Sequence, residues 1–256
     1  MQNKSRPQPF AKRSLGQNFL VDQGVVNRIL DAFAAGKDDA VLEIGPGRGA
    51  LTEGLVKSAG RVYVIEFDNN LAARLRERFA EAGAFTVIED DVLKIEFREI
   101  SSGGRLRLIS NLPYNISTVV LQKLFDYRDV FSDCVLMFQK EVAERITAKP
   151  GTKDRGYLSV LTEVYFNVTR LFDVAPGAFH PPPKIWSSVV RLIPTDTVID
   201  RPVEFSKLVA AGFAQKRKTI ANNLKTFSPS YGAALDKAMI DGSRRAETLT
   251  LDEWML

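Results

Sequence analysis

The sequence predicts an α/β fold, a parallel sheet covered by helices on both faces, followed by a small all-helical domain. Three observations predict it. Short apolar runs alternate with amphipathic segments up to about residue 148. The connections between them are short, as in parallel sheets. After residue 197 only helical periodicity remains. We therefore expect two domains, residues 1–196 and residues 197–256.

The individual elements follow from the same periodicities. The expected strands of the parallel sheet lie at 40–44, 61–65, 85–88, 106–109 and 133–138. The expected helices around them lie at 22–35, through Leu51, Leu55 and Val56, and at 69–82, 118–125 and 141–148. Two further strands, 168–174 and 187–193, are joined by a proline-rich loop and should form an antiparallel edge. Helices at 203–213, 219–224 and 232–239, with a short piece after Thr250, make up the second domain.

The charged residues give a mildly basic balance, 35 Lys and Arg against 31 Asp and Glu, for a net charge of +4. The cations are clustered: Lys4, Arg6, Lys12 and Arg13 precede the first acid, and Lys216-Arg217-Lys218 lies near the C-terminus. Such clusters are typical of proteins that contact a phosphate backbone. A basic tail and a solvated helix face would look the same, so charge alone leaves both interpretations open.

The scarcity of Cys and His excludes several kinds of chemistry. With one cysteine, Cys134, the chain can form no internal disulfide, and with one histidine, His180, it cannot assemble a Cys/His zinc site. We expect no metal. No apolar stretch reaches the roughly 20 residues that span a bilayer, and no apolar signal core follows the basic N-terminus. We expect a soluble, cytoplasmic protein without membrane contact, and a monomer, since nothing requires a dimer.

A glycine-rich loop and acidic residues at three consecutive strand ends predict a nucleotide site. The loop Glu43–Gly49 (EIGPGRG) closes the first strand, and Glu66 ends the second, where a carboxylate can accept both ribose hydroxyls of an adenosine. Asp90 and Asp91 end the third strand, where either can accept an adenine amine, with Val92 packing on the ring. The spacing Gly-x-Gly-x-Gly differs from the dinucleotide pattern. NAD remains a formal alternative, although no His or Lys is placed for hydride chemistry.

The segment Asn111-Leu112-Pro113-Tyr114 at the end of the fourth strand is the most specific feature. The exocyclic amine of adenine is a poor nucleophile because its lone pair is delocalised into the ring. Two acceptors, the Asn111 side-chain oxygen and the Leu112 carbonyl, can bond both N–H groups and draw that lone pair back onto nitrogen. Pro113 stiffens the turn, and Tyr114 offers a ring on which a base can stack. An ordinary Asn-Pro turn is the plainer alternative.

These residues resemble the small-subunit ribosomal RNA adenine dimethyltransferases over nearly the whole chain. Leu15–Leu20 (LGQNFL) resembles the N-terminal cofactor motif of the family, 43–52 its glycine loop, and 111–117 (NLPYNIS) its catalytic loop. Phe179–Lys184 (FHPPPK) resembles its FxPxPK loop, and 213–224 its C-terminal basic helix. One departure is Trp186, where the family usually carries an acidic or small polar residue. It could stack on a base or fill the sheet edge, and we favour packing.

The resemblance implies a Rossmann-like S-adenosylmethionine-dependent methyltransferase fold with a small C-terminal all-helical RNA-binding domain. It also implies Asp91 rather than Asp90 as the cofactor ligand, and a target base held between Tyr114 and Phe179. The expected cofactor-binding residues are Gln17, Asn18, Leu20, Gly45, Gly47, Glu66, Asp91, Val92 and Asn111. The expected catalytic residues are Asn111, Leu112, Pro113, Tyr114 and Phe179, and the expected RNA-binding residues are Arg13, Lys184, Lys216, Arg217 and Lys218.

The activity implied by the resemblance is the formation of dimethyladenosine from two adjacent adenines near the 3′ end of small-subunit ribosomal RNA, with S-adenosylmethionine as cofactor. The expected partner is this RNA in an immature small subunit. Three alternatives remain open. They are a large-subunit RNA dimethyltransferase of the macrolide-resistance type, a non-catalytic RNA-binding or transcription factor on the same fold, and, less favoured, a DNA adenine methyltransferase.

Overall fold

The computed structural model describes residues 17–101 and 103–256, and the chain divides into two compact units. The first consists of the chain up to Lys140 together with Arg170–Leu192, and the second of Glu141–Thr169 with Ile193–Leu256. The second unit therefore includes a segment that the sequence periodicity assigns to the first domain. The reason is that helices of this segment pack against helices near the C-terminus, a pairing that periodicity along the chain does not reveal.

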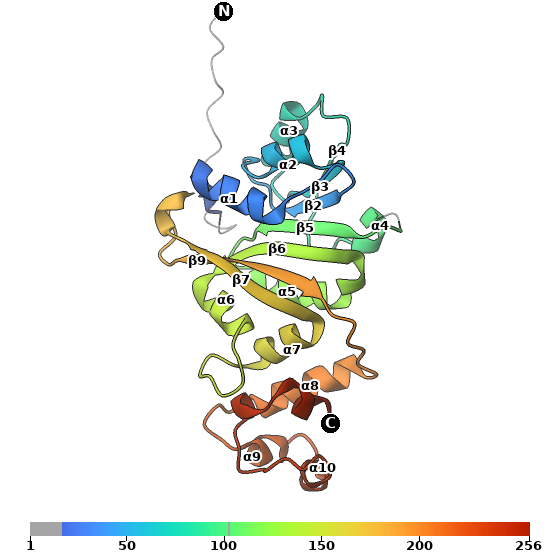
Figure 1. Ribbon diagram of the computed structural model, residues 1–256, viewed down its shortest axis with the longest axis vertical. Helices are drawn as coiled ribbons and strands as arrows, with labels where there is room; N and C mark the ends of the chain where they lie inside the picture. The colour runs from blue at the N-terminus through green and yellow to red at the C-terminus, as the bar shows by residue number, and fades with distance from the viewer. Residues whose placement is uncertain (1–16, 102) are drawn as a thin grey trace, which may run out of the picture. The chain divides into compact units, whose positions relative to one another are not determined.

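A seven-stranded sheet forms the centre of the first unit, with the order β4-β3-β2-β5-β6-β9-β7 (Figure 1). The strands from β4 to β6 are parallel, and β9 pairs antiparallel with β6, which confirms the expected mostly parallel sheet with an antiparallel edge. The strands are β2 Ala40–Ile44, β3 Arg61–Ile65, β4 Phe85–Ile88, β5 Leu106–Asn111, β6 Phe131–Gln139, β7 Phe166–Val174 and β9 Ser187–Pro194.

Capping side chains set the beginning of two helices in the first unit, α1 and α3. In α1 the Asp22 side chain accepts a hydrogen bond from Val25 N, and Ala34 ends the helix in the left-handed conformation. Arg107 of β5 then donates to the terminal carbonyls of Phe33 and Ala34. The helices are α1 Gln23–Phe33, α2 Thr52–Ser58, α3 Asn69–Arg78, α4 Phe97–Ser101 and α5 Ser117–Asp126, with 3₁₀ turns at Arg128–Val130 and Pro176–Ala178.

The core forms where helix stripes meet alternate strand residues. Val26, Ile29 and Phe33 project from one side of α1 into a cluster that includes Val41 of β2 and Val64 of β3, all at most 2% exposed. This packing fixes the strands, and the carboxyl ends of β2, β3 and β5 then meet at one edge of the sheet.

A second sheet of two short strands joins distant parts of the chain. In it, β1 (Phe19–Leu20) pairs antiparallel with β8 (Phe179–His180), so that Phe19 lies opposite His180 and Leu20 opposite Phe179. Strands of two residues carry no readable periodicity, and the sequence did not predict this sheet. It attaches the N-terminal motif to the proline-rich loop.

The second unit is helical and is held by buried polar contacts as well as apolar ones. Arg155 is fully buried, pairs with Glu163 at 2.7 Å and donates to the Ala148 carbonyl. Phe213 stacks on Trp254 with ring centroids 5.7 Å apart. Its helices are α6 Lys140–Ile146, α7 Tyr157–Tyr165, α8 Pro202–Gly212, α9 Ile220–Leu224, α10 Tyr231–Lys237 and α11 Leu251–Met255. Among the residues that the structure describes, no helix is long and apolar enough to cross a membrane.

Candidate active site

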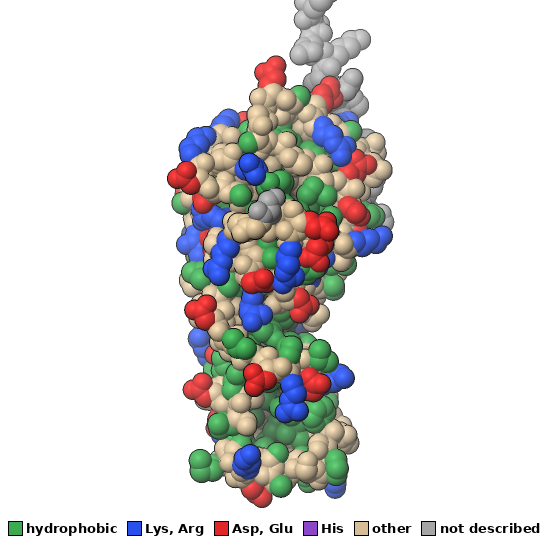
Figure 2. Space-filling model, turned by 90° about the vertical axis from the view of Figure 1, so that its right-hand side faces the viewer, with side chains coloured by type: hydrophobic (Ala, Val, Ile, Leu, Met, Phe, Trp, Pro, Cys, Tyr) green, Lys and Arg blue, Asp and Glu red, His purple; other side chains and the backbone are tan. Residues whose placement is uncertain are grey.

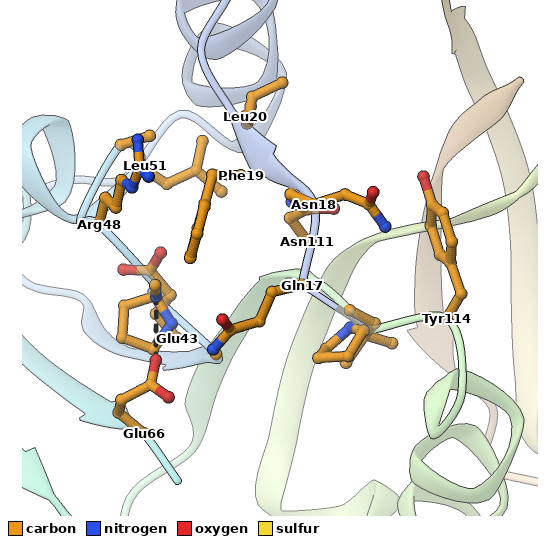
Figure 3. Close-up of a pocket in the computed structure, with 16 residues that line it drawn as sticks. Gln17, Asn18, Phe19, Leu20, Glu43, Arg48, Leu51, Glu66, Asn111 and Tyr114 are labelled. Carbon is orange, nitrogen blue, oxygen red and sulfur yellow. Dashed lines mark hydrogen bonds between the residues drawn. The ribbon is translucent and has the colours of Figure 1, made fainter. Parts of the chain in front are cut away.

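Two adjoining pockets of about 670 and 720 Å³ lie at the carboxyl ends of β2, β3 and β5. They share Gln17, Gly45, Glu66 and Pro113 in their walls, and together have the size of a site for a nucleotide-like ligand. Figure 3 shows the first pocket, with Glu43 and Glu66 on one side, Asn111 and Tyr114 on the other, and the Gln17–Leu20 segment across it.

The glycine loop allows the backbone to form a close wall. Gly47 has a φ of 58°, a conformation that side chains rarely adopt, and a Cβ there would lie 3.1 Å from the Phe19 ring. The Gly47 N–H donates to Glu66 Oε2 at 3.0 Å, so the loop and the end of β3 are joined directly. A side chain at Gly47 would strain the loop and would require the Phe19 ring to shift slightly.

Glu66 is buried, with 6% of its surface exposed, and its Oε1 accepts a second backbone N–H, that of Asp68 at 2.9 Å. Burial raises the pKa of Glu66, while the hydrogen bonds from Asp68 and Gly47 act in the opposite direction. Each carboxylate oxygen retains a lone pair, so the group can still accept hydroxyl donors. This donor set fits the two ribose hydroxyls of an adenosine.

Glu43 is a second buried acid in the pocket wall, to which the sequence analysis assigned no role. It is 2% exposed, and Thr52 Oγ1 donates to its Oε2 at 2.6 Å. Burial raises the pKa of Glu43 to about 8; the hydrogen bond from Thr52 opposes this shift, and the nearby charge of Glu66 adds to it. An acidic residue inside an apolar strand run was the available sequence signal, because such a residue must face a partner or a ligand.

Asp90 and Asp91 both line the second pocket, together with Val92, which is 5% exposed. Asp91 Oδ1 accepts the Leu93 N–H at 3.0 Å, and Asp90 Oδ1 accepts the Asp91 N–H at 2.7 Å. The geometry brings both carboxylates to the pocket and does not separate them. Phe67, 58% exposed, lies in the same wall and was missed by the sequence analysis. Its position directly after Glu66 was the available signal.

The Asn111–Tyr114 segment lines the first pocket beside these acids. Asn111 Nδ2 donates to the backbone carbonyl of Asn18 at 3.2 Å, which directs the amide so that Oδ1 remains an acceptor. The Tyr114 hydroxyl lies 2.5 Å from Ser187 Oγ at the start of β9. Burial raises the pKa of Tyr114, and the bond to Ser187 opposes this. The N-terminal segment and β9 therefore both position this loop.

Phe179 lies elsewhere than expected. It is 3% exposed within the main core cluster, and the described residues that line the two pockets do not include it. Its β8 strand is paired with β1, so the ring faces the core in this conformation. A base-stacking role for Phe179 stays a prediction that requires β8 to shift.

The expected RNA-binding residues are dispersed. Lys184 is exposed near β9, and Arg13 lies outside the described residues. Lys216, Arg217 and Lys218 are exposed on the turn between α8 and α9, which corrects the expectation of one basic helix over 213–224. Helix α8 ends at Gly212, before this turn. Asn223 Nδ2 donates to the carbonyls of Gly212 and Gln215, which a continuing helix would satisfy with backbone N–H groups. On the face in Figure 2, Lys and Arg side chains are interspersed with Asp and Glu.

The sheet order, the loop after β2 and the acid after β3 are those of the Rossmann-like methyltransferases, and this is the class to which the fold and the site belong. The chain belongs to the ribosomal RNA adenine dimethylase family, since the sequence model of that family matches residues 10–256. It is therefore an S-adenosylmethionine-dependent methyltransferase, as predicted.

Named relatives and solved structures agree with this. The chain is 43% identical over 255 residues to the ribosomal RNA small subunit methyltransferase A of Geobacter metallireducens, covering 95% of this chain and 93% of that one. It is 45% identical to the protein of the same name in Geobacter sulfurreducens, covering 95% and 92%. A Plasmodium falciparum dimethyladenosine transferase structure superposes with a TM-score of 0.78 at 27% identity, covering 92% and 94%. The 23S ribosomal RNA methyltransferase ErmE gives a TM-score of 0.72 at 25% identity, covering 93% and 96%.

Proposed function

We propose that this protein dimethylates the N6 amines of two adjacent adenines near the 3′ end of small-subunit ribosomal RNA, using S-adenosylmethionine. The observation that carries the proposal is the Asn111 amide, directed by the Asn18 carbonyl toward a pocket whose opposite wall carries Glu43 and Glu66. The RNA class follows from relatives at 43–45% identity that are named for the small subunit. Since ribosomal subunits are the proposed substrate, we also propose that the protein acts in the cytoplasm, and we propose that it does so as a monomer.

The residues present fit the cofactor. Glu66 would accept the ribose hydroxyls, and Asp91 with Val92 and Phe67 would hold the adenine in the second pocket. The Gln17–Leu20 segment and the glycine loop would enclose the amino-acid end in the first pocket, beside Glu43. The cofactor supplies a methyl group on a positively charged sulfur, so two buried carboxylates nearby complement its charge.

The chain's own contribution to the reaction is to orient and polarise the target amine. Asn111 Oδ1 would accept one N–H of the adenine amine, and the Leu112 carbonyl the other. Both acceptors are held in place, Asn111 by the Asn18 carbonyl and the loop by the Tyr114–Ser187 hydrogen bond. The Tyr114 ring would stack on the base. Such preorganised contacts stabilise the developing charge without reorganisation during the reaction.

The substrate is tested with labelled S-adenosylmethionine and three acceptors offered separately: small subunits lacking the modification, large subunits, and duplex DNA. We expect label only in the dimethyladenosine of the small subunit. Label only in the large subunit would favour a second candidate function, methylation of large-subunit RNA. This candidate is supported by the TM-score of 0.72 to the 23S ribosomal RNA methyltransferase ErmE. Absence of label despite cofactor binding would refute the enzymatic proposal.

The Asn111→Ala variant tests the assigned chemistry. We expect it to lower kcat by roughly 10²–10³, the loss typical of removing one preorganised hydrogen-bonding group, while cofactor affinity changes little. Asn27→Ala on the exposed face of α1 is a matched control that should keep full activity. Full turnover by Asn111→Ala would overturn the assignment.

A further inference from the structure

Trp186 is a large aromatic side chain at an exposed position, directly before β9. Its side chain is 50% exposed, and Ile185 before it is 42% exposed. The other tryptophan, Trp254, is 5% exposed and stacked on Phe213 in the second unit. The packing role that we favoured for Trp186 from the sequence therefore accounts for only half of its surface.

The backbone at Trp186 is held firmly, so the ring is presented from a fixed point. The Trp186 carbonyl accepts the Lys140 N–H at 2.9 Å, and the next residue, Ser187, pairs with Gln139 of β6. This differs from an aromatic side chain on a loose loop, because little backbone entropy is lost when a ligand binds to it.

The strand register places Trp186 at the same edge of the sheet as the candidate active site. Asn111 lies opposite Met137, and Met137 opposite Val189, so Trp186 is two strands across from Asn111 and three residues further toward that edge. With ordinary strand spacings this separates the two Cα atoms by roughly 14 Å. A base one or two positions along an extended strand from a target adenine lies within reach of a ring at such a distance.

The residue that follows Trp186 contacts the base-stacking loop. Ser187 Oγ, one residue from Trp186, lies 2.5 Å from the Tyr114 hydroxyl. The exposed Lys184 stands two residues before Trp186, and the described part of the chain gives it no ion pair. A cation beside an exposed ring is the combination with which proteins bind the phosphates and bases of single-stranded nucleic acid.

We propose that Trp186 is a stacking platform for an unpaired RNA base one or two positions from the target adenine. The proposal rests on the proposed function and adds a specificity surface to the same site. The platform holds the strand while the target adenine is turned into the Asn111 pocket. Because every base has a π face, this contact positions the RNA without reading its sequence.

Binding is measured first, by tryptophan fluorescence with small-subunit ribosomal RNA as the probe. The chain has two tryptophans, so Trp254→Phe leaves Trp186 as the only reporter. We expect RNA to quench this emission. Unchanged emission at RNA concentrations that saturate binding would overturn the proposal. This readout does not depend on methyl transfer, so it separates a failed platform from a failed proposed function.

Activity on unmodified small subunits is measured second. Loss of one base–aromatic stack should raise the KM for the subunit about 5- to 150-fold in Trp186→Ala, while affinity for S-adenosylmethionine, measured by calorimetry, stays unchanged and shows that the variant is folded. Trp186→Phe should restore most of the affinity and Trp186→Leu should not. Equal rescue by Leu would indicate an apolar protein contact and overturn the stacking role. Ile193→Ala is the matched control, because Ile193 is 46% exposed at the other end of β9, and it should leave the KM for the subunit unchanged.

Discussion

Replacing Glu43 with Gln should change how the stability of the cofactor-free protein depends on pH. The buried carboxyl has a pKa of about 8, against 4.5 for an ordinary glutamic acid. Between these values the folded protein binds a proton that the unfolded chain does not, so the free energy of unfolding falls as pH rises. The contribution is fully present below about pH 4.5 and is lost as pH passes through 8.

The expected magnitude follows from 1.36 kcal/mol for each pKa unit. Between pH 5.5 and 7.5, Glu43 alone should lower the free energy of unfolding by roughly 2.5 kcal/mol. Glu43→Gln removes the titration but keeps the volume and an oxygen that can accept the Thr52 hydroxyl. The free energy of unfolding is measured by guanidinium denaturation at the two pH values. From the lower to the higher pH, it should fall by about 2.5 kcal/mol more in the wild type than in the variant.

If the free energy of unfolding fell by the same amount in the wild type and in Glu43→Gln, Glu43 would not be neutral in the folded protein, and the reasoning would be refuted. Glu99→Gln, on the exposed side of α4, is the control and should follow the wild type. The same reasoning predicts that binding cationic S-adenosylmethionine ionises Glu43 and releases close to one proton at pH 7. Calorimetry in buffers with different ionisation enthalpies would measure that proton, which should be absent in Glu43→Gln.

Three further predictions concern stability and RNA binding. Gly60→Ala should destabilise the protein by about 1–3 kcal/mol, because its Cβ would overlap the Lys37 carbonyl, whereas Gly83→Ala, with nothing within 4 Å, should be neutral in thermal unfolding. Thr250→Ala removes the capping box of α11 and should lower stability by about 0.5–2 kcal/mol, and Thr250→Ser should recover most of it. Arg217→Gln should reduce the slope of log affinity for RNA against log salt by about one; an unchanged slope would remove Arg217 from the interface.

The sequence was sufficient for the central sheet because burial in parallel strands leaves long apolar runs. The strand predicted at 61–65 matches β3, and the strand at 85–88 matches β4. The helix α7, in contrast, was missed. Seven of its nine residues are buried, so it carries no clear apolar stripe.

The candidate site was predictable where its residues follow strand ends in sequence order, as Glu66 and Asn111 do. The contacts that orient these residues were not, because they come from remote segments. Asn18 binds Asn111, Ser187 binds Tyr114, and the pairing of Leu20 with Phe179 holds Phe179 in the core. Two-residue strands and single hydrogen bonds leave no periodic trace in a sequence.

The pairing of β1 with β8 has a consequence for the order of events during synthesis. Residues 17–20 leave the ribosome well before their partner β8, which lies beyond six strands of the main sheet. The wall that Gln17–Leu20 give to the cofactor pocket can dock on β8 only after residue 180 has emerged. A growing chain therefore has its glycine loop and Glu66 in place while the pocket still lacks this wall, and capacity to hold the methyl donor arrives late in translation.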